Sequence, residues 1–275
     1  MLTHSPHPRP ASPDRPGLLV SVRNVAEARA AMAGGADVID IKEPAAGALG
    51  AASPTTIQQV AAAATSTHCV SAALGELVDG PPPTLLSAPA VRGLDFVKVG
   101  LGGAPANWRA RLDALARQVG AARFVVAVYA DAEHVGAPPL EAALAWMTRR
   151  AARPRDAIAG LLIDTAIKDG RGLRTWVDDA TLARAIGRAH AAGAFVALAG
   201  SLRADDLPHC ASLGPDLLAV RGAACRHGDR RGTIRADLVR HLKQTITTAH
   251  RATHTRLTPL PQRASDTSSP ASRAS

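Results

Sequence analysis

Short apolar runs alternate with alanine-rich segments along most of the chain. The runs cover 18–22, 37–42, 68–74, 94–99, 123–129, 159–164, 194–200 and 216–221. Apolar runs of this length, with few polar interruptions, are typical of strands that are buried on both faces. The alanine-rich segments between them are typical of helices. The pattern therefore predicts a parallel sheet that is covered by helices.

A local motif recurs before three of the runs. In AMAGGADVIDIK (31–42), AHAAGAFVALAG (189–200) and CASLGPDLLAVRG (210–222), a helical segment ends at a glycine turn and a buried strand follows. Glycine is the expected residue just after the last helical turn. Eight such units in about 230 residues predict a (β/α)8 TIM barrel. The alternative is a doubly wound open sheet, which usually has a glycine-rich phosphate loop after its first strand; LLVSVRN (18–24) has no such loop.

The two ends of the chain depart from this pattern. Residues 1–16 are rich in Pro, His and Ser, and residues 248–275 are rich in Ser, Thr, Pro and Arg. We expect two disordered tails, 1–16 and 248–275, around one barrel domain at 17–247. No apolar run reaches the roughly 18 residues of a membrane span, and the first residues lack the apolar region of a secretory signal. We therefore expect a cytoplasmic protein with no membrane association.

Charge and cysteine content narrow the possible partners. The net charge is +9, and the two tails hold six Arg against two Asp. The remaining charge forms no basic stripe and aromatic residues make up only 3%, so we expect no binding of nucleic acid. A basic surface also attracts anionic small molecules. The three cysteines have no metal-ligand spacing, which indicates a reducing compartment and no metal site.

Lysine is rare in this chain. Of 32 basic residues only four are Lys, namely Lys42, Lys98, Lys168 and Lys243. A Lys amine can lose its proton and attack a carbonyl group, whereas an Arg guanidinium cannot. Lys42 ends the second run, Lys98 lies near the end of the fourth and Lys168 follows the sixth. Barrel active sites lie at these strand ends, so we expect three of the lysines at one face and Lys243 on a solvated helix.

Two carboxylates accompany these amines. Asp40 precedes Lys42 by two residues, which places both on the same face of a strand, and Asp164 with Lys168 forms a second acid–amine pair. Amines crowded by other cations have lowered pKa values and form imines with aldehydes or ketones. A second amine or a carboxylate then moves the proton. A structural ion pair is the alternative for any one pair, but three lysines on one rim favour imine chemistry.

The last two strands predict a phosphate site. Small residues and glycines follow both of them, and barrels frequently bind phosphate at the loops after strands seven and eight. We expect backbone groups of Gly200, Ser201 and Gly222 to bind phosphate and Arg221 to act as a charged clamp. Other polar residues expected around this substrate site are Ser21, Tyr129 and Asp131. The predicted substrate is a phosphorylated aldehyde or ketone.

The ordered motifs resemble those of one enzyme family. The motifs are LLVSV, GGADVIDIKEPAAGALGA, DFVKVGL, YADA, LIDTAIKDG, ALAGSL and VRGAACRHGDR, which lie between residues 18 and 245. Together they resemble the (5-formylfuran-3-yl)methyl phosphate synthase family of methanofuran biosynthesis. The resemblance implies a TIM barrel that works like a class I aldolase without metal or organic cofactor. Two molecules of glyceraldehyde 3-phosphate would condense to the furan aldehyde phosphate.

The resemblance also implies roles for individual residues. Lys42 matches the imine-forming Lys of the family's D-x-K strand end, and Lys98 matches the proton acceptor of its VKVG strand. Asp40, Asp164 and Lys168 match further active-site positions. The chain departs from the archaeal relatives at both tails and in the proline-rich loop 79–89.

Two other functions stay open. Some decarboxylating barrels carry a D-x-K motif, but they usually have a further Asp shortly after the Lys, where this chain has Glu43, Pro44 and Ala45. A non-catalytic phosphate-binding barrel is the other alternative. Because barrels of this size often associate, we also expect a homo-oligomer.

Overall fold

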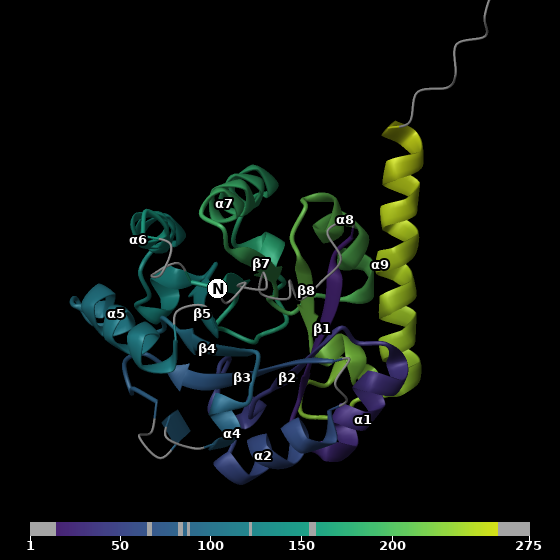
Figure 1. Ribbon diagram of the computed structural model, residues 1–275. Helices are drawn as coiled ribbons and strands as arrows, with labels where there is room; N and C mark the ends of the chain where they lie inside the picture. Colours follow the sequence, from purple (N-terminus) through teal and green to yellow (C-terminus); the bar gives the residue numbers. More distant parts are fainter. Residues whose placement is uncertain are drawn as a thin grey trace, which may run out of the picture.

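Eight parallel strands form a closed barrel in the computed structural model (Figure 1). The structure describes residues 15–64, 68–81, 85–86, 89–120, 123–153 and 158–257. Neighbouring strands pair in sequence order, and β8 pairs with β1 to close the barrel. The prediction of a TIM barrel is therefore confirmed, and the doubly wound sheet is excluded. The strands are β1 (Gly17–Val22), β2 (Val38–Ile41), β3 (Cys69–Glu76), β4 (Phe96–Gly100), β5 (Phe124–Tyr129), β6 (Gly160–Asp164), β7 (Phe195–Leu198) and β8 (Leu217–Val220).

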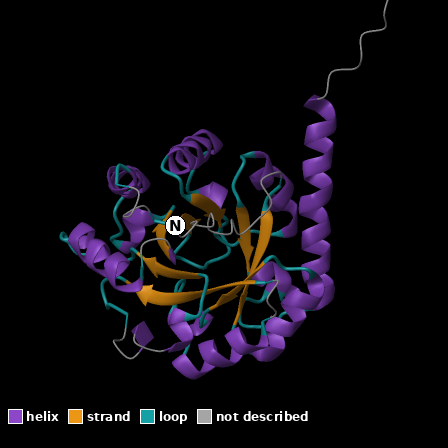
Figure 2. Ribbon diagram, in the orientation of Figure 1, coloured by secondary structure: helices purple, strands orange, loops and turns teal. Residues whose placement is uncertain are grey.

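Helices surround the barrel on its outer side (Figure 2). They are α1 (Val25–Gly34), α2 (Pro54–Ala63), α4 (Pro89–Arg92), α5 (Trp108–Val119), α6 (Leu140–Ala151), α7 (Asp179–Ala191), α8 (Leu207–Ser212) and α9 (Ala236–Leu257). Helix α1 begins where the Asn24 side chain accepts a hydrogen bond from the Glu27 N–H, and it ends at Gly35 with φ +89°. Both are the residue types that such helix ends favour.

The tail boundaries differ from those predicted. Helix α9 continues to Leu257, past the predicted domain boundary at residue 247. At the other end, the Arg15 side chain donates to Thr247 Oγ1 at 3.0 Å, so the ordered part begins before residue 17. Residues 1–14 and 258–275, and part of the loop 79–89, lie outside the described residues. Among the described helices, none combines the length and apolar character of a membrane span.

The core has two layers that follow from the alternation of side chains along each strand. Val20, Ile39, Val99 and their counterparts point outward and pack against the helices. The inward layer combines alanines such as Ala73 and Ala197 with larger residues such as Leu162. Phe96 and Phe195 meet inside the barrel with ring centroids 5.0 Å apart. The interior is therefore packed, as in other TIM barrels.

Aspartates fix the register at the opposite end of the barrel from the predicted site. Asp37, Asp95 and Asp216 each stand one residue before a strand. Their carboxylates accept the backbone N–H of Leu18, Val70 and Val196 on the preceding strand, at 2.6 to 2.8 Å. These bonds satisfy strand-end donors that would otherwise lack a partner.

Candidate active site

A buried carboxylate, Asp40 on β2, organises one side of the site. Its Oδ2 accepts from Ser21 Oγ at 2.9 Å, and its Oδ1 accepts from Ser71 Oγ at 2.8 Å. Lys98 Nζ lies 2.5 Å from the same Oδ1, and both side chains are at most 5% exposed. Burial raises the pKa of Asp40, but the charges of Lys98 and Lys42 outweigh burial and hold that pKa below 3.8. Asp40 is thus an ionised partner for Lys98.

Lys42 differs from the other lysines of the site because no carboxylate in the described part of the chain pairs with it. Its Nζ donates to the carbonyl oxygen of Ala48 at 3.3 Å, and no carboxylate of the described residues lies within ion-pair distance of it. Burial, reinforced by the positive charges of Lys168 and Lys98, lowers the pKa of Lys42 to about 8 even though Asp164 opposes the shift. An amine with this pKa is partly unprotonated at neutral pH, which a nucleophile requires.

A second acid–amine pair lies at the end of β6. Lys168 Nζ is 2.7 Å from Asp164 Oδ1 and 3.3 Å from Thr165 Oγ1. The Asp164 carboxylate also accepts the backbone N–H of Thr165. Burial alone would raise the pKa of Asp164. The positive charges of Lys168 and Lys42 outweigh burial and hold that pKa below 3.8. Lys42, Lys98 and Lys168 therefore lie at one end of the barrel with Asp40 and Asp164, where the sequence predicted them.

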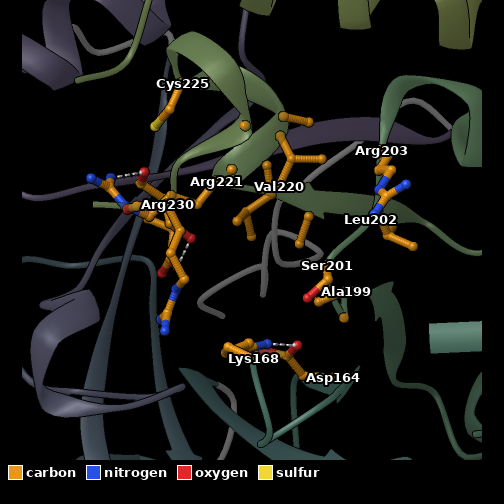
Figure 3. Close-up of a pocket in the computed structure, with 18 of the residues that line it drawn as sticks. Asp164, Lys168, Ala199, Ser201, Leu202, Arg203, Val220, Arg221, Cys225 and Arg230 are labelled. Carbon is orange, nitrogen blue, oxygen red and sulfur yellow. Dashed lines mark hydrogen bonds and ion pairs between the residues drawn. The ribbon is translucent and has the colours of Figure 1, made fainter. Parts of the chain in front are cut away.

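These residues line one cavity at the mouth of the barrel. Its volume is about 700 Å³, within the range of sites for small-molecule ligands. The lining includes Ser21 and the five residues above, together with Gly200, Ser201 and Gly222 from the loops after β7 and β8. Figure 3 shows Lys168 paired with Asp164, with Arg203 and Arg230 on the loops at either side.

The backbone of the β7 loop suits the expected phosphate site. Gly200 has φ +97° and Ser201 has φ +53°. A left-handed conformation is unusual for serine. The preceding residue, Gly200, is also constrained by its surroundings, because a Cβ added to it would lie only 3.1 Å from side-chain atoms of Thr165 and Leu173. Successive backbone N–H groups in a turn conformation form concave sites that bind anions.

Arg221 is placed differently from its predicted role. Its guanidinium donates to Glu27 and to the carbonyl oxygens of Ser21, Arg230 and Gly232, at 2.5 to 3.3 Å. Glu27 is 1% exposed, so the pair is a buried structural link between α1 and the β8 loop. The expectation of Arg221 as a free phosphate clamp does not fit these contacts, because its donors are already in use.

Asp131 is also directed away from the cavity. Its two oxygens accept the backbone N–H groups of Ala166 and Ile167 at 2.8 and 2.7 Å. The residue is 2% exposed and does not line the cavity. Asp131 was expected to contact the substrate, but these bonds instead shape the loop that carries Lys168.

Replacing Asp131 by alanine is expected to destabilise the protein and displace Lys168. Two partly buried N–H donors would lose their acceptor, at about 1 kcal/mol for each bond. We expect Asp131→Ala to have a clearly lower melting temperature and a lower kcat than the wild type. Asp131→Asn keeps one acceptor oxygen, so its values should lie between those of the wild type and Asp131→Ala. Thermal unfolding and steady-state kinetics of the two variants test this; unchanged kinetics in Asp131→Ala would contradict it.

Tyr129 belongs to a separate pair on the rim. Its hydroxyl donates to Glu76, and Glu76 also accepts the Gly102 N–H at 2.8 Å. A Cβ on Gly100 would collide with both side chains, so this glycine is needed for the pair to form. Tyr129 is 1% exposed and does not line the cavity. The structure thus does not bring Tyr129 into contact with the cavity, where the sequence analysis expected it.

Sequence reasoning missed several polar residues near the site. Ser71 was detectable as a hydroxyl among the apolar residues of 68–74. Glu76, Thr165, Arg203 and Arg230 lie at strand ends or in loops, where no periodic pattern marks them. No group of three or more His, Cys, Asp or Glu side chains within the described part of the chain is placed to hold a metal ion.

Comparison with known sequences identifies similar proteins. The model of the family described as 4-HFC-P synthase matches residues 18–243. The (5-formylfuran-3-yl)methyl phosphate synthase of Methanopyrus kandleri is 40% identical over 243 residues, covering 84% of this chain and 99% of the relative. The synthase of Methanocaldococcus jannaschii is 38% identical over 238 residues, covering 82% and 98%.

Solved structures support the fold. Phosphoribosyl anthranilate isomerase from Thermotoga maritima aligns with a TM-score of 0.61 at 16% identity, covering 85% of this chain and 99% of that one. 3-Hexulose-6-phosphate synthase from Salmonella typhimurium aligns with a TM-score of 0.53 at 18% identity, covering 85% and 100%. At these identities the likeness shows a shared barrel and carries no information about chemistry.

Proposed function

The chain belongs to the 4-HFC-P synthase family, and on that premise we propose that it condenses two molecules of glyceraldehyde 3-phosphate into (5-formylfuran-3-yl)methyl phosphate through an imine on Lys42. One observation carries the proposal. Lys42 is the amine of the cavity that has no carboxylate partner among the described residues, and its pKa is about 8. The other two cavity lysines are paired with Asp40 and Asp164.

The first chemical step is attack of Lys42 Nζ on the aldehyde carbon of one triose phosphate. Lys98, whose Nζ lies 2.5 Å from Asp40 Oδ1, gives a proton to the hydroxyl of the carbinolamine, which leaves as water. The resulting iminium withdraws electrons from the neighbouring C–H bond. Lys98, now a free amine, accepts the proton from that carbon. The same amine thus acts first as an acid and then as a base.

The carbon nucleophile formed in this way attacks the aldehyde of the second triose phosphate. Ring closure and elimination then release one inorganic phosphate and two waters, which balances the atoms of two triose phosphates against the furan product. Asp164 and Lys168 line the same cavity and can exchange protons with the hydroxyl groups that leave. Backbone N–H groups of Gly200, Ser201 and Gly222 are proposed to bind one phosphate group.

A product assay tests this function directly. The purified protein should convert glyceraldehyde 3-phosphate alone into a product with furan absorbance in the near ultraviolet and the mass of the furan aldehyde phosphate. Binding of the triose without product would support a non-catalytic phosphate-binding barrel. Turnover without a borohydride-trapped adduct on Lys42 would support chemistry like that of the D-x-K decarboxylases. Assembly into a homo-oligomer stays a prediction, which light scattering can test.

The trapping rate should rise with pH. Because the pKa of Lys42 is about 8, roughly a tenth of the amine is unprotonated at pH 7 and roughly nine-tenths at pH 9. The initial rate of cyanoborohydride trapping by a triose phosphate should therefore rise about tenfold per unit below pH 8 and level off above it. Mass spectrometry of short reactions between about pH 6 and pH 9 measures this. A rate that still climbs at about pH 10, as for an ordinary lysine, would contradict it.

A further inference from the structure

Arg230, in the loop after β8, lines the same cavity as Lys42 at the mouth of the barrel. Its Nη2 donates to the carbonyl oxygen of Gly47 at 3.2 Å, and Lys42 Nζ donates to the carbonyl of the next residue, Ala48, at 3.3 Å. Consecutive Cα atoms are about 3.8 Å apart. The short loop between β2 and α2 therefore holds a guanidinium and the proposed nucleophile as neighbours.

The charges around the cavity leave Arg230 without a counterion. Lys98, Lys168 and Arg221 each have a carboxylate partner. No carboxylate in the described part of the chain lies within ion-pair distance of Arg230. The adjacent Asp229 is exposed and accepts the Arg231 N–H. Burial lowers the pKa of Arg230, although the charge of Asp164, which is itself paired with Lys168, partly opposes the shift. The lowered pKa reflects the cost of holding this charge partly out of water.

The substrate itself can supply the missing negative charge. A guanidinium binds phosphate through two parallel N–H bonds, and the one bond to Gly47 leaves other donors of Arg230 free. In glyceraldehyde 3-phosphate, four covalent bonds separate the carbonyl carbon from phosphorus. One molecule can therefore place its aldehyde at Lys42 and its phosphate at the neighbouring Arg230.

We propose that Arg230, supported by Gly47, forms a second anion subsite that binds the phosphate of the triose that reacts with Lys42. The inference rests on the proposed function. The subsite differs from the backbone site at Gly200 and Ser201, which would take the phosphate of the second triose. Arg230 thus takes the role that the sequence analysis gave to Arg221, whose donors are used within the protein. It is a specificity residue for a phosphorylated aldehyde.

Borohydride trapping with two aldehydes tests the subsite. Arg230→Met removes the charge but keeps an apolar stem, and Arg230→Lys keeps a charge but loses the planar fork. With glyceraldehyde 3-phosphate, we expect trapping at Lys42 to slow roughly 100-fold in Arg230→Met and less in Arg230→Lys. With unphosphorylated glyceraldehyde, the slower rate should be the same in the wild type and both variants. Arg226→Met, an exposed residue of the same loop, is the matched control and should behave as the wild type with both aldehydes.

The outcomes separate this inference from the proposed function. If Arg230→Met slows trapping equally with both aldehydes, Arg230 acts on Lys42 or on the fold. If Arg230→Met leaves the rate with the phosphorylated aldehyde unchanged, Arg230 does not bind its phosphate. Either result overturns the subsite. If the wild type forms no adduct with either aldehyde, the proposed function fails. Calorimetric titration with inorganic phosphate then decides the subsite, because two sites in the wild type and one in Arg230→Met support it, whereas equal numbers of sites overturn it.

Discussion

Replacing Lys42 by arginine is expected to abolish product formation and adduct trapping while leaving the barrel folded. Arginine keeps the positive charge and can still donate to the Ala48 carbonyl, but a guanidinium does not form an imine. Loss of a nucleophile typically lowers kcat by several orders of magnitude, so we expect a decrease of roughly 10⁴-fold or more. Product absorbance and mass spectrometry after borohydride treatment measure the two effects.

Lys243 provides the matched control for this substitution. It is the fourth lysine of the chain and forms an ion pair with Asp37, at the strand-start end of the barrel rather than at the cavity. The expectation that Lys243 is simply solvated was therefore wrong, but its distance from the chemistry makes Lys243→Arg a suitable comparison. We expect unchanged trapping and turnover in that variant. Residual turnover near the wild-type rate in Lys42→Arg would remove the basis of the imine mechanism.

The strand pattern predicted the fold and much of the site because both depend on backbone periodicity. Parallel strands in a barrel end at the same edge, so residues at the ends of apolar runs must lie together. Lys42, Lys98 and Asp164 could be placed in this way without knowledge of any side-chain contact. Lys168 follows its strand by only four residues, too few to leave the same rim.

The contacts of loop side chains could not be predicted in this way. Arg221 directly follows the last apolar run, as a phosphate clamp would, and only the fold shows that Glu27 of α1 lies close enough to pair with it. In the same way, Asp131 lies just after β5, at a position typical of a catalytic acid, yet its partners are the backbone N–H groups of Ala166 and Ile167. These partners are far away in sequence, and no local pattern encodes them.

The arrangement of pairs explains why one lysine is suited to be the nucleophile. Asp40 and Asp164 each form a direct ion pair with a different lysine, Lys98 and Lys168. Lys42 is therefore left without a direct ion pair among the described residues. Burial is the main cause of its lowered pKa, the positive charges of Lys168 and Lys98 add to it, and Asp164 and Asp40 oppose it without reversing it.

Replacing Asp40 by asparagine is expected to give the largest loss of stability of the substitutions considered, together with loss of activity. The change leaves the buried ammonium of Lys98 without a counterion, and breaking a buried pair in this way costs about 3 to 5 kcal/mol. For a domain of this size, that corresponds to a melting temperature lower by roughly 10 °C. Differential scanning calorimetry measures the shift. Activity should fall as well, because Lys98 would no longer be held for proton transfer.

A second substitution distinguishes the ion pair from a general effect of altering the core. In the double variant Asp40→Asn with Lys98→Met, no buried charge is left unpaired, and the asparagine still offers an oxygen to Ser21 or Ser71. We therefore expect the double variant to melt at a higher temperature than Asp40→Asn alone, although it should be equally inactive. If the two substitutions lowered the melting temperature additively, Asp40 and Lys98 would not be coupled, and the role of Asp40 in holding the proton-transferring amine would have to be given up.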